Sequence, residues 1–243
     1  MPTKILVPHL GEEGWGRAVL ESFSVTEKPQ LILASNSPRR RQLLSLTGLP
    51  FTVSAANVDE STRSNESPAD YVLRLAETKA GAVKADEDQI ILAADTTVVD
   101  GSDILGKPED DAEATAMLRR LRGHTHQVYT GIALLRKSDG LLLKDLCVTD
   151  VPMRDYSDEE IRDYVATGDP LDKAGAYAIQ HAEFHPVANM EGCFASVMGL
   201  PVCHVILLMR KMNLQPNTDF FASCETLLEY DCPVSNAIMN GEM

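Results

Sequence analysis

Carboxylates and cations that could act on a polyphosphate lie along the chain near the ends of predicted strands. Glu60 follows an apolar segment, and Asp95 follows the apolar run Ile90–Ala94. Lys79 lies beside the apolar side of a predicted helix, and Lys107 lies in a loop before a proline. Carboxylates hold hard divalent cations, and cationic side chains neutralise phosphate oxygens, so together they provide what hydrolysis of a polyphosphate requires. Taken singly, each also fits an ordinary structural or solvent-exposed role.

The sharpest local signal is the segment 35–40, Ser-Asn-Ser-Pro-Arg-Arg, which joins an apolar run to a predicted helix. Ser37 is of the type found at helix N-caps, and the proline after it fits the first helical position. Free backbone N–H groups at a helix start attract anions, and Ser35 and Ser37 add hydroxyl donors. Arg39 and Arg40 in the first turn oppose the helix dipole unless an anion is bound. The pattern therefore fits a phosphate site, although a plain capped helix explains it as well.

Several familiar catalytic and metal-binding motifs are absent. The chain has no GxxxxGK[ST] loop, no GxGxxG after a strand, no HExxH and no Gly-x-Ser-x-Gly. No CxxC pair occurs, and the number of cysteines is odd, so neither a disulfide framework nor a zinc site of standard spacing is expected. The five cysteines are Cys147, Cys193, Cys203, Cys224 and Cys232.

The elements that must position these residues alternate between helical and extended patterns, and two turn signals, Asp100-Gly101 and Asp139-Gly140, mark hairpins. This mixture predicts an α/β fold with a mixed central sheet and flanking helices. Beyond residue 213 the pattern fades, and we expect a loosely ordered tail. The predicted strands are 31–34, 51–58, 90–99, 127–135, 141–151 and 174–179, and the predicted helices are 38–47, 68–84, 111–121, 158–167 and 202–212.

Composition and charge exclude several classes of protein. The 243 residues are 44% hydrophobic with a net charge of −14, and no apolar run is long enough to span a membrane. Residues 1–30 lack the apolar region of a secretory signal, so we expect a cytoplasmic protein without a membrane partner. The acidity argues against stable binding of nucleic acid. Residues 31–84 are the exception, with seven basic and five acidic side chains.

Eight segments, in order, resemble the motifs of the Maf-like nucleotide pyrophosphatases, which is far more specific than any one match. The sequence departs from the family pattern in two places: His181 follows Gln180 where the family usually has Gly, and residues 192–196 read Gly-Cys-Phe-Ala-Ser instead of Gly-Ser-Tyr-Ser-Asn. The matching segments are Leu31–Arg40 (LILASNSPRR), Val58–Glu60 (VDE), Arg74–Ala80 (RLAETKA), Ala94–Val99 (ADTTVV), Leu105–Pro108 (LGKP), Val128–Gly131 (VYTG), Asp172–Gln180 (DKAGAYAIQ) and Val197–Pro201 (VMGLP).

The resemblance implies a Maf/ITPase-like fold with two lobes around a cleft. It also implies hydrolysis of a nucleoside triphosphate to the monophosphate and pyrophosphate with a divalent cation, Mg²⁺ or Mn²⁺. The Asp-Thr of the ADT motif and the Tyr-Ala-Ile-Gln run are similar to the branch that acts on dTTP and UTP.

Site roles carried over by the resemblance fall into three groups. Asp95 would accept the proton of the attacking water and, with Glu60, would hold the metal. Substrate choice would rest on Arg39, Thr96 and Gln180. The phosphates would be bound by Ser35, Ser37, Arg40, Lys79 and Lys107.

The resemblance covers residues 31–212, which leaves an N-terminal extension, 1–30, and a C-terminal extension, 213–243. Two other functions stay open from the sequence: hydrolysis of m7GTP or another modified nucleotide, and a non-enzymatic role in nucleotide sensing or in regulating cell division. The partner is expected to be a nucleoside triphosphate, and a homodimer is left open.

Overall fold

A computed structural model describes residues 31–217 and 219–242. The predicted N-terminal extension, 1–30, lies outside the described residues. Within them, the predicted mixed sheet with flanking helices is confirmed. None of the described helices has the length and apolar character needed to cross a bilayer.

The sheet has the strand order β2-β1-β3-β5-β6, with β4 paired to β3 at one end. β1 pairs in parallel with β2 and β3, whereas β3, β5 and β6 form an antiparallel meander. The predicted hairpin turns join β3 to β4 and β5 to β6. The strands are β1 (Leu31–Leu33), β2 (Phe51–Val53), β3 (Ile90–Asp100), β4 (Asp103–Leu105), β5 (Thr125–Arg136) and β6 (Leu142–Pro152).

The helices begin where capping residues predict. Ser37, Ser67 and Asp110 each accept a hydrogen bond from a backbone N–H in the first turn of the helix that follows, and Ser157 forms a complete capping box with Glu160. The helices are α1 (Pro38–Ser45), α2 (Pro68–Ala82), α3 (Asp111–Leu121), α4 (Asp158–Ala166), α5 (Phe194–Val197), α6 (Val202–Lys211), α7 (Phe220–Leu228) and α8 (Ser235–Asn240), with 3₁₀ turns at Asp169–Asp172 and Ala174–Ala176.

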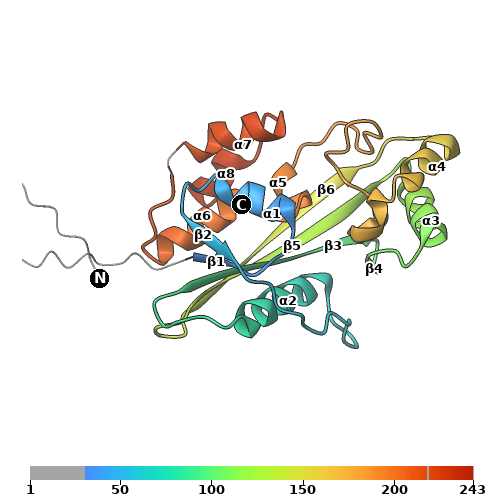
Figure 1. The fold of residues 1–243 in the computed structure, drawn as a ribbon. Helices are drawn as coiled ribbons and strands as arrows, with labels where there is room; N and C mark the ends of the chain where they lie inside the picture. The colour runs from blue at the N-terminus through green and yellow to red at the C-terminus, as the bar shows by residue number, and fades with distance from the viewer. Residues whose placement is uncertain (1–30, 218, 243) are drawn as a thin grey trace, which may run out of the picture.

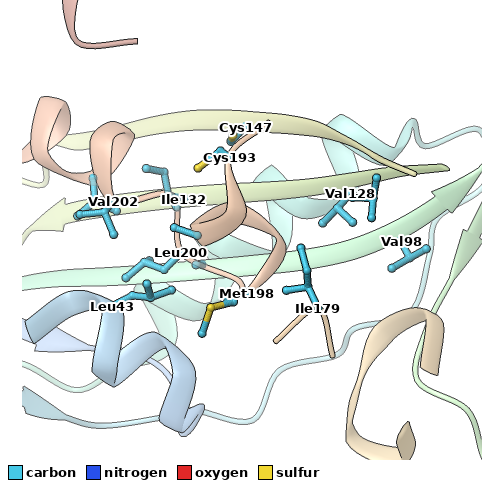
Figure 2. Packing of buried hydrophobic residues seen from close by; sticks show 14 of the residues in the cluster. Leu43, Val98, Val128, Ile132, Cys147, Ile179, Cys193, Met198, Leu200 and Val202 are labelled. Atoms are coloured by element: carbon cyan, nitrogen blue, oxygen red, sulfur yellow. The ribbon is translucent and has the colours of Figure 1, made fainter. Parts of the chain in front are cut away.

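Helices cover both faces of the sheet, so β3 is buried on both sides. α2 lies on one face, and α1, α5 and α6 lie on the other (Figure 1). Ile91 and Ala93 pack towards α2, while Ile90 and Leu92 belong to the larger apolar cluster on the opposite face. Figure 2 shows part of that larger cluster. Successive side chains of β3 therefore lie on opposite faces of the sheet, as in any pleated strand.

Two lobes are visible along the long strands. β3, β5 and β6 extend beyond β1 and β2 to a second group of elements, α3 and α4 (Figure 1). α3 and α4 pack against each other and against the 3₁₀ turns. The predicted arrangement of two lobes is therefore present, with the cleft between them described below.

Two predicted strands differ from the structure. The strand expected at 51–58 ends at Val53, so Glu60 lies in the loop that leads to α2 and does not end a strand. The strand expected at 174–179 is absent, because Gly175 (φ +69°) and Ala176 (φ +62°) have left-handed backbone conformations that form a 3₁₀ turn. A left-handed residue cannot continue an extended strand.

The C-terminal tail is not loosely ordered, contrary to the sequence-based expectation. It forms α7 and α8, and Phe220 and Ile238 are buried in the larger apolar cluster. Helices of six and nine residues are not stable alone, and the order of these two comes from packing against α5 and α6.

The side chain of Tyr230 joins the C-terminal tail to the loop before α5, and its replacement should weaken the packing of the tail. The Tyr230 hydroxyl lies 3.1 Å from the Met190 carbonyl and 2.9 Å from the Gly192 carbonyl, to which it donates. Tyr230→Phe should lower the free energy of unfolding by about 1 kcal/mol, because the hydrogen bond is lost without a change in shape. Urea denaturation measures this. Tyr129→Phe is the control, since its hydroxyl bonds to Gln127 near the surface; equal losses in the two variants would refute the attachment.

Candidate active site

A cleft of about 670 Å³ lies between the two lobes, which is a usual size for a small-molecule site. One side is formed by the segment from β1 to the start of α1, and the other by residues 106–107 and 172–180. All ten residues proposed from the sequence line this cleft, although they come from distant parts of the chain: Ser35, Ser37, Arg39, Arg40, Glu60, Lys79, Asp95, Thr96, Lys107 and Gln180.

Lys79 lies between two carboxylates in this cleft. Its Nζ donates to Asp95 Oδ1 at 2.6 Å and forms an ion pair with Glu60 Oε1 at 2.7 Å. Asp95 and Lys79 are mostly buried, whereas the Glu60 side chain is half exposed. Burial raises the pKa of Glu60, but the hydrogen bond and charge of Lys79 outweigh it and hold that pKa below its ordinary value. Glu60 is therefore a carboxylate at neutral pH.

Helix α2 contains Lys79, and it also contacts the loop that carries Glu60. The Tyr71 hydroxyl, on α2, donates to the Glu60 carbonyl at 2.8 Å. Tyr71 and Lys79 are separated by two steps of four residues, which places them on one side of the helix. Burial, together with the charges of Asp95 and Glu60, raises the pKa of Tyr71 to about 12, so it remains a neutral donor.

The close packing of α2 on the sheet depends on Gly131, which pairs directly with Asp95 across β3 and β5. A Cβ atom at residue 131 would lie 2.7 Å from the carbonyl carbon and oxygen of Val72 and 2.9 Å from the backbone nitrogen of Leu73. Because these are helix backbone atoms, the missing side chain allows α2 to approach the sheet where Asp95 meets Lys79.

Arg40 ties three parts of the cleft wall together, on the face of β3 opposite Asp95. Its Nε donates to the Gly199 carbonyl at 2.8 Å, and its terminal nitrogens donate to Thr96 Oγ1 at 3.2 Å and Ser35 Oγ at 3.3 Å. Thr96 Oγ1 also lies 3.0 Å from Thr130 Oγ1. Burial lowers the pKa of Arg40, and the charge of Asp95 opposes that shift. Arg40 has five N–H donors, so two remain for a ligand.

Three of the ten residues proposed from the sequence have side chains with no hydrogen bond or ion pair to any other described residue: Arg39, Lys107 and Gln180. Two are cations and the third is an amide that can both donate and accept. They are therefore available to contact a ligand without first breaking an internal bond.

Sequence reasoning missed two pairs that shape the far side of the cleft. Lys173 donates to both Asp169 (2.8 Å) and Asp172 (2.6 Å), so this buried cation is already neutralised. Tyr177, whose hydroxyl lies 2.9 Å from His126 Nε2, also lines the cleft. His126 is 2% exposed, and burial lowers its pKa to about 4, so the imidazole is neutral. His126 and Tyr177 are 51 positions apart in the sequence, and Asp169 and Asp172 lie in a 3₁₀ turn. The periodicity of the sequence predicts neither contact.

Arg40→Lys should lower kcat/KM for the nucleotide substrate by about tenfold, because one ammonium cannot reach partners on three separate elements. Steady-state kinetics measure the effect. Arg41→Lys is the matched control: it is the next residue of α1, exposed, and its side chain has no partner among the described residues. Equal kcat/KM values for the two variants would show that the three-way contact is unimportant.

The chain matches known proteins over most of its length. The family of Maf-like proteins matches residues 30–212. A dTTP/UTP pyrophosphatase of Geobacter sulfurreducens is 46% identical over 189 residues, which cover 77% of this chain and 98% of that protein. A dTTP/UTP pyrophosphatase of Hahella chejuensis is 44% identical over 190 residues, covering 76% of this chain and 94% of that protein.

Among solved structures, the chain is similar to a nucleoside-triphosphatase / dITP/XTP pyrophosphatase of Mycobacterium abscessus, with a TM-score of 0.38 and 11% identity. That similarity covers 76% of this chain and 97% of the other. The Ham1 protein of Staphylococcus aureus has a TM-score of 0.37 and 14% identity, covering 52% of this chain and 72% of the other.

Proposed function

The chain belongs to the Maf-like protein family, and on that basis we propose that it hydrolyses dTTP and UTP to the monophosphate and pyrophosphate. The observation that carries the proposal is that relatives named dTTP/UTP pyrophosphatase are 42–46% identical to it over nearly their whole length. The cleft adds support, because it gathers cationic side chains around the carboxylates of Glu60 and Asp95 in a volume suited to a nucleotide.

The triphosphate would lie along the cationic side of the cleft. The backbone N–H of Arg39 in the first turn of α1 and the hydroxyls of Ser35 and Ser37 present donors to phosphate oxygens. Lys107 lines the cleft on the other lobe, and its charge helps to lower the pKa of Glu60. Arg40 would bind phosphate oxygens with the two N–H donors that make no bond to the cleft wall.

The residues fit a divalent cation that arrives with the substrate. Glu60 and Asp95 both bond to one Lys79 ammonium, so their oxygens are close enough to face a common cation. No group of three or more His, Cys, Asp or Glu ligands exists within 31–217 and 219–242. Mg²⁺ commonly takes one or two protein carboxylates and fills its other positions with water and substrate phosphates. Glu60 and Asp95 would therefore hold it, and when bound it would neutralise phosphate charge.

Asp95 would act as the base. Its carboxylate accepts the proton of a water molecule that attacks the α-phosphorus, and the bond from that phosphorus to the bridging oxygen breaks. Lys79 keeps the Asp95 carboxylate oriented through the 2.6 Å hydrogen bond and lowers the cost of placing phosphate oxygens beside it. Pyrophosphate then leaves on the side of Ser37 and Lys107.

The base and sugar would be selected on the other face of β3. Thr96 presents its hydroxyl between Arg40 and Thr130, and Gln180 and Arg39 face the same cleft without internal partners among the described residues. An amide such as Gln180 can donate and accept at once, which is what the edge of a pyrimidine requires.

The proposal is tested by measuring pyrophosphate release from dTTP, UTP, m7GTP and the other canonical triphosphates with Mg²⁺ and Mn²⁺. We expect dTTP and UTP to give kcat/KM values about tenfold or more above m7GTP, a discrimination of about 1.4 kcal/mol. A preference for m7GTP would reassign the substrate. Thermal stabilisation by dTTP without turnover under either metal would favour a non-enzymatic nucleotide sensor and overturn the proposal.

We also propose boundaries for the catalytic domain and a location for the protein in the cell. Residues 31–212 would form the catalytic domain, with 1–30 and 213–243 as extensions. A cytoplasmic location would give it access to the nucleotide pool.

A further inference from the structure

A second cluster of reactive side chains lies behind the cleft, on the side of β6 that faces α5 and α6. It contains two buried thiols, Cys147 on β6 and Cys193 just before α5. Figure 2 shows their sulfur atoms side by side, and each thiol is near enough to shift the pKa of the other. The hydrolysis described above uses neither of them.

His204 connects one of these thiols to a carboxylate. The imidazole on α6 lies 2.9 Å, by its Nδ1, from Asp145 Oδ2, and it is near enough to Cys147 for the two groups to shift each other's pKa. Burial lowers the pKa of His204, but these two partners outweigh it and raise the pKa to about 9. The hydrogen bond from Cys193, and then that from His204, hold the pKa of Cys147 below its ordinary value. A thiolate is the nucleophilic form of cysteine.

The segment that carries Cys193 is the same one that forms part of the cleft wall. Ser196 Oγ donates to the Cys193 carbonyl at 2.7 Å, and the Ser196 carbonyl accepts from Thr130 Oγ1 at 2.8 Å. Thr130 contacts Thr96, and Gly199, at the end of the segment, accepts from Arg40. A displacement at Cys193 is therefore transmitted through hydrogen bonds to residues of the cleft.

The segment also has little room to adjust on the side of β6. A Cβ atom at Gly192 would lie 2.5 Å from Thr149 Cγ2, so the backbone already touches β6. Thr149 Oγ1 lies 2.7 Å from Ser196 Oγ. A new covalent bond between β6 and residue 193 would have to move this packed segment.

From this arrangement we propose that Cys147 and Cys193 form a reversible disulfide when the protein meets a hydroperoxide, and that the bond lowers turnover in the cleft. The Cys147 thiolate attacks a peroxide oxygen and the O–O bond breaks, which gives a sulfenic acid; the leaving hydroxide becomes water with a proton that His204 is placed to supply. The Cys193 sulfur then forms the S–S bond as the S–O bond breaks, and the second leaving hydroxide takes up the thiol proton of Cys193. Two thiols are oxidised, and hydrogen peroxide is reduced to two waters.

Peptide mapping of the full chain treated with hydrogen peroxide tests the bond directly. Trypsin should yield residues 145–154 joined to 174–210, two hydrogens lighter than the separate peptides. Because residue 203 is also in the second peptide, fragmentation must place the bond at Cys193, and Cys203→Ser should leave it unchanged. Cross-linking only among Cys203, Cys224 and Cys232, or oxidation without any bond between 147 and 193, would overturn the proposal.

The effect on turnover rests on the proposed function, whereas the cross-link does not. Oxidation should lower dTTP turnover by about tenfold or more, as small displacements at an active site can, and dithiothreitol should restore it. A Cys224→Ser/Cys232→Ser variant should respond like the unmodified protein, and Cys193→Ser should lose the dithiothreitol-reversible response. A cross-link that leaves turnover unchanged would overturn the regulatory role, and absence of turnover in the reduced protein would refute the proposed function instead.

Discussion

Asp95→Asn should lower kcat for dTTP by roughly 10³-fold, within the range usual for loss of a general base. The amide keeps the size of the side chain but accepts no proton from water at neutral pH. Lys79 retains its ion pair with Glu60 at 2.7 Å, so the fold should survive the change. Rapid mixing with excess enzyme, followed by measurement of pyrophosphate, separates the chemical step from product release.

Asp100→Asn provides the matched control for this variant. Asp100 is in the same strand, and it is paired with Arg120 at 2.6 Å, but it does not line the cleft. We expect Asp100→Asn to lose some stability and to retain its activity. If Asp95→Asn kept more than about a tenth of the unmodified rate, a loss under the 1.4 kcal/mol of one decade, Asp95 would not be the base.

Gly131→Ala should destabilise the protein by about 3 kcal/mol, because the new methyl group meets the backbone of α2 and no side chain can move aside. The helix must shift away from β5, and Lys79 moves with it. Urea denaturation should show the loss of stability, and the fraction that remains folded should bind dTTP more weakly.

Gly81→Ala is the control, since this glycine belongs to the same helix and no atom lies within 4 Å of the place that its Cβ would take. There, alanine should raise the free energy of unfolding by about 0.5–1 kcal/mol, because it restricts the unfolded chain and favours the helix. Similar effects of both substitutions would mean that the approach of α2 does not depend on Gly131.

Locally coded features of the fold were predictable from the sequence. Ser37 and Ser157 cap helices because their hydroxyls reach backbone groups three residues away, and the turn at Asp100-Gly101 needs only its own two residues. The strand predicted at 174–179 was wrong because the left-handed turn at Gly175 and Ala176 is set by its neighbours: a Cβ atom on Gly175 would lie 2.8 Å from Val98 Cγ2.

The membership of the candidate site was predictable, but its internal connections were not. Ordered motifs identified Arg40 as a cleft residue, yet its bond to Gly199 joins positions 159 residues apart and emerges only from the folded chain. The same holds for the contact of His204 with Asp145 and for the order of the C-terminal tail, which packs against α5 and α6.

Because side chains alternate along β3, Asp95 and Thr96 lie on opposite faces of the sheet. Lys79 bonds to Asp95, and Arg40 bonds to Thr96. With the roles proposed above, the base and the residue that selects the nucleotide would thus lie on opposite faces of one strand that lines a single cleft. Replacements around Thr96 can alter which base is accepted while the hydrolytic pair stays intact, so new specificities are open to this scaffold by exchange of side chains. Insertion of a single residue between them would place both side chains on the same face, so at least one of the contacts with Lys79 and Arg40 would be lost.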